Sequence, residues 1–195
     1  MSTKERILEE ALTLFSEQGY DGTGIDEIAA HVGIKGPSIY KYFKSKEEIL
    51  DELIDSAEER YDELFGSEVN IGRIPENRRD FIESTMKRIS FTIHDPMIQK
   101  IRKTLVREQF RNERCAEVTT RHQLLGVQKM YTRIISEMIK KELIIRDDPE
   151  MLALELLGPV VLMVARADRE PQLADEIMKD IENHLKHFCK IYMKE

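Results

Sequence analysis

The chain has 195 residues, of which 34% are charged and 41% hydrophobic, with no tryptophan and a net charge of −7. This composition excludes a disordered chain and favours a helix-rich globular protein. The longest apolar run, residues 156–165, is about half as long as a membrane span requires, so no membrane partner is expected. Two widely separated cysteines and the lack of a signal peptide before Lys4 predict a cytoplasmic protein.

Capping patterns and apolar spacing predict helices near the amino terminus. Ser2 with Glu5, and Ser45 with Glu48, form capping boxes that each open a helix. Thr23 is expected to cap a second helix, with Asp26 three residues later, where its carboxylate suits the positive end of the helix. The helices predicted in this part of the chain cover residues 2–19, 23–33, 35–42 and 45–65.

The rest of the sequence continues the helical period. A loop is marked by Gly66, Gly72 and Pro75. Three further helices are expected to start where a proline in the first helical turn follows an acidic residue. These pairs are Asp95–Pro96, Asp148–Pro149 and Glu170–Pro171. No stretch alternates like a strand, so an all-α fold is predicted. The predicted helices cover residues 76–93, 96–110, 119–142, 149–168 and 171–193.

One short segment reverses the acidity of the chain. The sequence "GIKGPSIYKYFKSKEE", residues 33–48, contains four lysines, and no acidic residue lies between Glu27 and Glu47. The spacing of Ala29, Gly33 and Ile39 is typical of two short helices joined by a tight turn: a small residue permits close approach, glycine permits positive φ, and an apolar side chain anchors the second helix. A helix-turn-helix is therefore predicted.

The second helix of this motif is expected to expose cations, hydroxyls and aromatic rings, which suit contacts to DNA phosphates and bases. Its short length fits entry into a major groove. The alternatives are that the lysines form a solvated face and that each tyrosine only packs. The residues expected on the exposed side are Lys35, Ser38, Tyr40, Lys41 and Tyr42.

The stretch "FSEQGYDGTGIDEIAAHVGIKGPSIYKYFKSKEEIL", residues 15–50, resembles the amino-terminal domain of the TetR family of bacterial transcription regulators. The resemblance implies that Phe43 lies in the core. It also implies phosphate contacts by Thr23, Tyr40, Tyr42 and Lys46, and an approach to the bases by Lys35, Pro37, Ser38 and Lys41. Lys35 and Pro37 depart from the family, which often has a small hydroxyl residue and a glycine there.

Two domains are predicted: a three-helix DNA-binding domain over residues 1–46, joined by a long helix to a larger helical ligand-binding and dimerisation domain over residues 47–195. The helix from Pro149 is apolar on more than one face, which indicates burial against two neighbours. Gly158–Pro159 is expected to kink it and to permit close approach of another helix. A monomer with one central helix is the alternative. The residues predicted at a homodimer interface are Leu156, Val160, Met163, Val164, Ile181, Leu185 and Phe188.

The larger part is expected to bind a small-molecule effector, as the resemblance implies. The candidates combine polar groups on apolar helix faces with flexible or aromatic side chains, although such residues are more often plain core or salt-bridge partners. His184, His187 and Cys189 lack the spacing of a metal site. No cofactor is expected, and no catalytic motif points to an enzyme. The candidate ligand-binding residues are Tyr61, Met86, Phe91, Arg102, Leu105, Gln109, His122 and Met130.

The sequence thus predicts a homodimeric DNA-binding transcriptional regulator. It is expected to repress from a palindromic operator in double-stranded DNA and to be released by a small-molecule effector. One alternative is a sequence-indifferent DNA-binding protein, which would bind random duplexes as tightly as any selected site. Another is a helical small-molecule-binding module without DNA binding.

Overall fold

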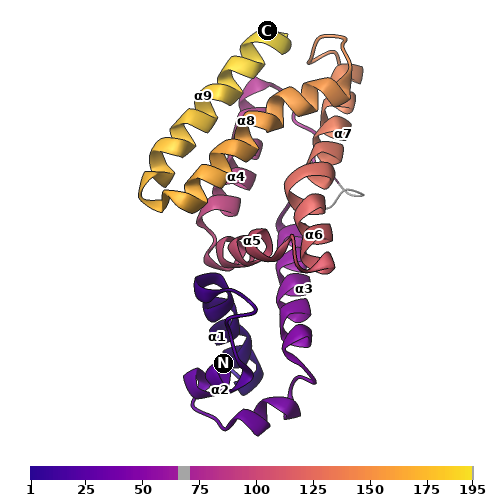
Figure 1. The fold of residues 1–195 in the computed structure, drawn as a ribbon. Helices are drawn as coiled ribbons and strands as arrows, with labels where there is room; N and C mark the ends of the chain where they lie inside the picture. The colour runs from indigo at the N-terminus through magenta and orange to yellow at the C-terminus, as the bar shows by residue number, and fades with distance from the viewer. Residues whose placement is uncertain (66–70, 195) are drawn as a thin grey trace. The chain divides into compact units, whose positions relative to one another are not determined.

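A computed structural model of the protein describes residues 1–65 and 71–194 (Figure 1). These residues form helices and no strand, and one isolated antiparallel bridge joins Ile144 to Met193. The prediction of an all-α fold is confirmed. The α-helices are α1 (Thr3–Gln18), α2 (Ile25–Val32), α3 (Lys46–Phe65), α4 (Arg78–His94), α5 (Pro96–Glu108), α6 (Glu113–Thr120), α7 (Gly126–Lys140), α8 (Pro149–Arg169) and α9 (Ala174–Tyr192). Two short 3-10 helices are η1 (Gly36–Lys41) and η3 (Pro171–Leu173), and η2 (Arg121–Leu125) is a π-helical segment.

The chain forms two compact units. The first contains Met1–Tyr61 and Pro96–Thr119, so that α5 and α6 group with the amino-terminal helices. The second contains the described residues between Asp62 and Asp95 and those from Thr120 onward. The division into functional domains at residues 46 and 47 stays a prediction, and the compact units do not follow it.

The first unit is built from helices that each bury one apolar stripe. The predicted capping box of Ser2 and Glu5 opens α1, and Gly19 ends it with φ +90°. At the start of α3, the side chain of Ser45 accepts a hydrogen bond from the amide of Glu48, which is one half of the predicted capping box. The Glu48 carboxylate accepts from the amide of Lys44 instead of that of Ser45. Helix α1 packs against both α2 and α5. The largest fully buried side chains of this unit are Ile7, Phe15, Ile28, Ile39, Phe43, Ile49, Leu50 and Ile54.

The second unit is a bundle in which α8 packs between α7 and α9, and α4 packs against α9 (Figure 1). Asp148 caps α8 through its side chain, with Pro149 in the first turn as predicted. The end of the chain is fastened to the loop before α8, because Lys194 donates its amide hydrogen to the carbonyl of Leu143. It is also fastened to α4, because Arg78 donates to the carbonyl of Met193. The core of this unit includes Phe81, Ile134, Ile135, Leu156, Ile181 and Leu185.

Several predicted boundaries were wrong. The cap of α2 is Gly24 rather than Thr23, and residues 36–41 form a 3-10 helix rather than an α-helix. Glu170 makes no side-chain cap, and α9 begins only after η3, at Ala174. The helix predicted from Thr119 starts at Glu113 and passes through the π-helical segment η2.

The predicted loop before α4 is described only in part. Gly72 takes a positive φ of 68° in it, whereas Gly66 lies outside the described residues. Across the described ranges, no helix combines the length and the apolar character that crossing a membrane requires.

Candidate nucleic-acid interface

The turn between α2 and η1 depends on a left-handed glycine. Gly33 has φ 77° and ψ 31°, as its position in the motif predicted. Its amide donates to the carbonyl of Ala30 at 3.1 Å, and the amide of Ile34 donates to the carbonyl of Ala29 at 2.9 Å. These bonds satisfy the last carbonyls of α2 and turn the chain sharply into η1.

The segment η1 has one buried side and one exposed side. Ile39 is completely buried, and Phe43 just beyond the segment is buried as well, so the two residues anchor it. Tyr40 is 59% exposed and Tyr42 is 41% exposed, although both are large and partly apolar. Exposed tyrosines beside the anchors leave hydroxyl groups available to a partner.

Cations surround these tyrosines. Lys35, Pro37, Lys41 and Lys44 are exposed, and Ser38 is half-buried. No acidic residue occurs from position 28 to position 46. This stretch is therefore rich in cations on a chain that is acidic as a whole, and exposed cations attract a polyanion. One carboxylate from outside the stretch, that of Asp26, lies against Gly36 of η1. The exposed side of η1, here called the basic face, comprises Lys35, Pro37, Ser38, Tyr40, Lys41 and Tyr42.

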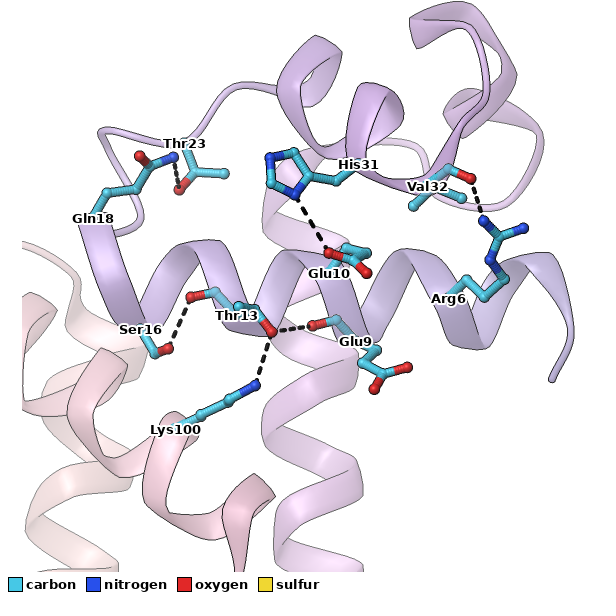
Figure 2. Close-up of polar contacts among 10 residues, drawn as sticks. All are labelled: Arg6, Glu9, Glu10, Thr13, Ser16, Gln18, Thr23, His31, Val32 and Lys100. Atoms are coloured by element: carbon cyan, nitrogen blue, oxygen red, sulfur yellow. Dashed lines mark hydrogen bonds and ion pairs between the residues drawn. The ribbon is translucent and has the colours of Figure 1, made fainter. Parts of the chain in front are cut away.

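Two of the residues expected to contact phosphates, Thr23 and Lys46, use their side chains for hydrogen bonds within the chain. Thr23 is only 1% exposed. Its hydroxyl donates to the carbonyl of Gly19 at 2.8 Å. The same hydroxyl accepts from Gln18 Nε2 at 3.4 Å, as Figure 2 shows. Lys46 Nζ donates to the carbonyls of Tyr20 at 2.7 Å and Thr23 at 2.9 Å. Both side chains thus serve the turn between α1 and α2.

Polar contacts from α1 fix the orientation of α2. Arg6 donates through Nη2 to the carbonyl of Val32, at the carboxyl end of α2 (Figure 2). His31 Nδ1 lies 3.5 Å from Glu10 Oε2. These contacts add to the apolar packing of α1 on α2 and hold the helix that leads into η1 and its basic face.

Helix α5 supplies a second set of contacts that the sequence did not predict. Lys100 Nζ donates to Thr13 Oγ1 at 2.8 Å, as Figure 2 shows, and Arg107 Nη1 donates to the carbonyl of Glu17 at 3.1 Å. Glu108, which is buried, accepts a hydrogen bond from the amide of Tyr20 at 3.1 Å. The available signal in the sequence was an acidic residue close to the apolar stripe of α5.

Two groups in this unit have raised pKa values. Burial, with the nearby carboxylate of Glu47 as the next cause, raises the pKa of Tyr20 to about 12. Burial, followed by the charge of Glu108, raises the pKa of Cys115 to about 11. Both groups are therefore neutral at physiological pH, and neither opposes the positive field of the basic face.

The residues predicted to bind a ligand fall into both compact units. Tyr61, Arg102, Leu105 and Gln109 belong to the first unit, and Met86, Phe91, His122 and Met130 belong to the second. Arg102 and Leu105 are buried in the first unit. Met130 is buried in the core of the second unit, and Met86 packs against that core.

Most of the residues predicted at a dimer interface lie inside their own chain. Leu156, Val160, Ile181, Leu185 and Phe188 are buried in the core of the second unit. Met163 and Val164 are half-buried and pack against the same core. These side chains stabilise the bundle of α4, α7, α8 and α9, which is why they follow the helical period so closely.

The His184, His187 and Cys189 side chains of α9 do not share one environment. A ring nitrogen of His184, Nε2, lies 2.9 Å from the carbonyl oxygen of Leu156. His187 is exposed, whereas Cys189 is buried. Within the part of the chain that the structure describes, no group of three or more His, Cys, Asp or Glu residues is arranged to hold a metal ion.

The left-handed turn, the anchored η1 and its basic face define a helix-turn-helix DNA-binding protein. Residues 7–53 match the family model described as "Bacterial regulatory proteins, tetR family". The chain is 31% identical over 128 residues to IcaR of Staphylococcus epidermidis, an alignment that spans 49% of this chain and 68% of IcaR. IcaR of Staphylococcus aureus is 49% identical over 51 residues, which are 26% of this chain and 27% of that protein.

These relationships show that the chain belongs to the TetR family of bacterial transcriptional regulators. Solved structures of this family share the fold along nearly the whole chain. SmeT in its complex with triclosan matches with a TM-score of 0.78 at 21% identity, over 100% of this chain and 93% of SmeT. A transcriptional regulator from Aquifex aeolicus matches with a TM-score of 0.71 at 21% identity, over 95% and 98% of the two chains.

Proposed function

We propose that the protein is a homodimeric cytoplasmic repressor that binds a two-fold symmetric operator through its basic faces and leaves it when a small molecule binds. The observation that carries the proposal is the one-sided η1, with Ile39 buried beneath exposed Lys35, Tyr40 and Lys41. Repression is supported by the relative IcaR, a negative transcriptional regulator of the biofilm operon icaADBC. The operon that this chain regulates is not implied by that relationship.

The basic face suits both parts of DNA recognition. Lysine ammonium groups neutralise phosphates, and the tyrosine and serine hydroxyls donate hydrogen bonds to phosphate oxygens. Lys35, Pro37, Ser38 and Lys41 are proposed to approach the base edges, and Tyr40 and Tyr42 the phosphates. One such short segment reads only a few base pairs, so two copies are needed for useful specificity.

The exposed side of α8 is proposed as the surface that joins the two copies. Met151, Leu154 and Leu162 are exposed and recur at helical spacing, and Leu162 is 73% exposed. Gly158 lies between them, and a Cβ atom added there would meet no atom within 4 Å. A stripe of large apolar side chains around a glycine fits the close approach of a second helix. The residues that the sequence favoured for the interface stay a prediction, and five of those seven are buried within their own chain.

An effector is proposed to act through α3, which begins in the first compact unit and ends in the second. The fold is compatible with ligand binding, since SmeT, which shares it, was solved with triclosan. An effector weakens DNA binding only if its affinity differs between the DNA-bound and DNA-free states. The predicted ligand-binding residues stay a prediction, and those of each compact unit are candidates within that unit alone.

The proposal is tested by a charge reversal on the basic face. Duplexes are first selected from a random pool with the wild-type protein, and the affinity of Lys41→Glu for them is then measured by fluorescence anisotropy. Lys141→Glu makes the same charge change at an exposed residue outside the first compact unit and serves as the control. We expect Lys41→Glu to lose binding while circular dichroism stays unchanged, and Lys141→Glu to bind normally. Equal binding by both variants would refute the assignment of the face.

A further inference from the structure

The side chain of Lys46 lies within its own chain, although the family resemblance assigns it to a phosphate. Lys46 is the first residue of α3 and is half-buried. Its ammonium donates to the carbonyls of Tyr20 and Thr23, at 2.7 and 2.9 Å. It also lies 4.2 Å from the centroid of the Tyr20 ring. An ammonium group has three N–H donors, so two of them are used by these carbonyls while the ring covers the group.

The two carbonyls belong to the turn that leads into α2. Tyr20 and Thr23 bracket this turn, and the amide of Thr23 donates to the carbonyl of Tyr20 at 3.3 Å. The cap of α2, Gly24, follows directly. Charge-assisted hydrogen bonds are stronger than neutral ones, so Lys46 fixes the turn more firmly than the backbone bond alone would.

Tyr20 is contacted by residues of both α3 and α5. Its carbonyl and ring contact Lys46 on α3, and its amide donates to the buried carboxylate of Glu108 on α5. The ring also packs against Phe15 of α1, with 5.2 Å between the two centroids. The turn is thus fastened to three helices of the first unit, and the entry of the chain into α2 is fixed in place.

We propose that Lys46 is a positioning residue: it fastens the turn before α2 to the start of α3 and thereby sets the orientation of α2 and the basic face, without contacting a phosphate. The inference rests on the DNA-binding function proposed above. Base recognition requires an accurately placed face, whereas the attraction of exposed lysines to phosphates depends little on orientation. Lys46 should therefore contribute to specific binding and not to binding of random DNA.

The test compares Lys46→Met with Lys44→Met, which removes the same charge from an exposed side chain two residues earlier. Affinities for the selected duplex and for a random duplex are measured over a range of salt concentrations, well below the melting temperature of each variant. We expect Lys46→Met to bind the selected duplex about tenfold more weakly, to bind random duplex as the wild type does, and to keep the salt dependence. Lys44→Met should change the two affinities by the same factor.

The opposite pattern would overturn the proposal. If Lys46 contacts a phosphate, Lys46→Met weakens both duplexes alike, and the slope of log K against log salt falls by about 0.9 for each contact removed. If Lys46 only stabilises the fold, neither affinity changes at a temperature where the variant is fully folded, and the proposal fails in that case too.

A thermal cycle tests the same contact without DNA. Melting temperatures are measured for the wild type, Lys46→Met, Tyr20→Leu and the double variant. We expect Lys46→Met to melt at least about 4 °C lower, because it removes two charge-assisted hydrogen bonds and the ring contact. Tyr20→Leu keeps the backbone carbonyls, so only the ammonium–ring contact is removed by both changes, and the double variant should lose less than the sum of the two single losses. Strictly additive losses would show that the ammonium of Lys46 and the ring of Tyr20 are not coupled, and an unchanged melting temperature of Lys46→Met would show that Lys46 does not fasten the turn. If the wild type binds no duplex at all, the function proposed above fails, while this cycle still decides whether Lys46 fastens the turn.

Discussion

Replacing Gly33 by alanine tests the backbone geometry that presents the basic face. Gly33 has φ 77°, and a Cβ atom added there would meet no atom within 4 Å, so the substitution creates no steric clash with other residues. The cost comes from the left-handed conformation alone and is about 1–2 kcal/mol for a residue with a side chain. For a chain of this length we expect the melting temperature to fall by roughly 2–8 °C, as measured by circular dichroism.

Asparagine at position 33 separates backbone strain from crowding. Asparagine is larger than alanine but tolerates the left-handed region better. If the cost is backbone strain, Gly33→Asn will melt between the wild type and Gly33→Ala. If Gly33→Asn is as unstable as Gly33→Ala, or less stable, the reasoning from the backbone angle is wrong.

Three further predictions concern the anchor, the dimer and the thiols. Ile39→Ala should lower the free energy of unfolding by about 2–5 kcal/mol in urea denaturation, because it empties a fully buried site. Leu162→Glu should convert the dimer to monomers in sedimentation velocity while the helical content is retained, because it places a charge in the apolar stripe of α8. Burial raises the pKa of Cys115 and Cys189 to about 11 from an ordinary value of 9.0, so the unfolded chain loses these protons first. Stability should therefore fall as the pH rises from about 9 to 11, in denaturation curves recorded at several pH values.

Each of these predictions has a control or an outcome that would contradict it. A loss below about 1 kcal/mol for Ile39→Ala would mean that the site is less tightly packed than its burial indicates. Phe110→Glu makes the same kind of change at a residue that is 90% exposed in the first unit, and it should leave the dimer intact. A variant with both cysteines changed to alanine should lose part of the alkaline slope, and an unchanged slope would contradict the role of the thiols.

The sequence predicted the helix-turn-helix well because that motif depends on local rules. Gly33 must take a positive φ, Ala29 must be small and Ile39 must be apolar, and these three requirements lie within eleven residues of chain. The capping box at Ser2 likewise depends on a residue three positions away. The exposure of Tyr40 follows from the same helical spacing that buries Ile39. Such features need no knowledge of distant packing.

The features that were missed depend on contacts between distant segments. Glu108 accepts from an amide 88 residues earlier in the chain, and no periodic pattern specifies that pairing. The family resemblance implied a phosphate contact for Lys46, and only the folded turn brings the Tyr20 and Thr23 carbonyls to its ammonium group. On α8, apolar residues occur on several faces, so the sequence could not separate the buried Leu156 from the exposed Leu162.

The central claim is that two copies of the chain present two basic faces to one DNA duplex. Sequencing of duplexes selected by the wild-type protein from a random pool tests it most directly. We expect enrichment of one short sequence that occurs twice in inverted orientation, with centres about 10–10.5 base pairs apart or a multiple of that spacing. Enrichment of a single unpaired half-site, or recovery of no sequence above the starting pool, would contradict it.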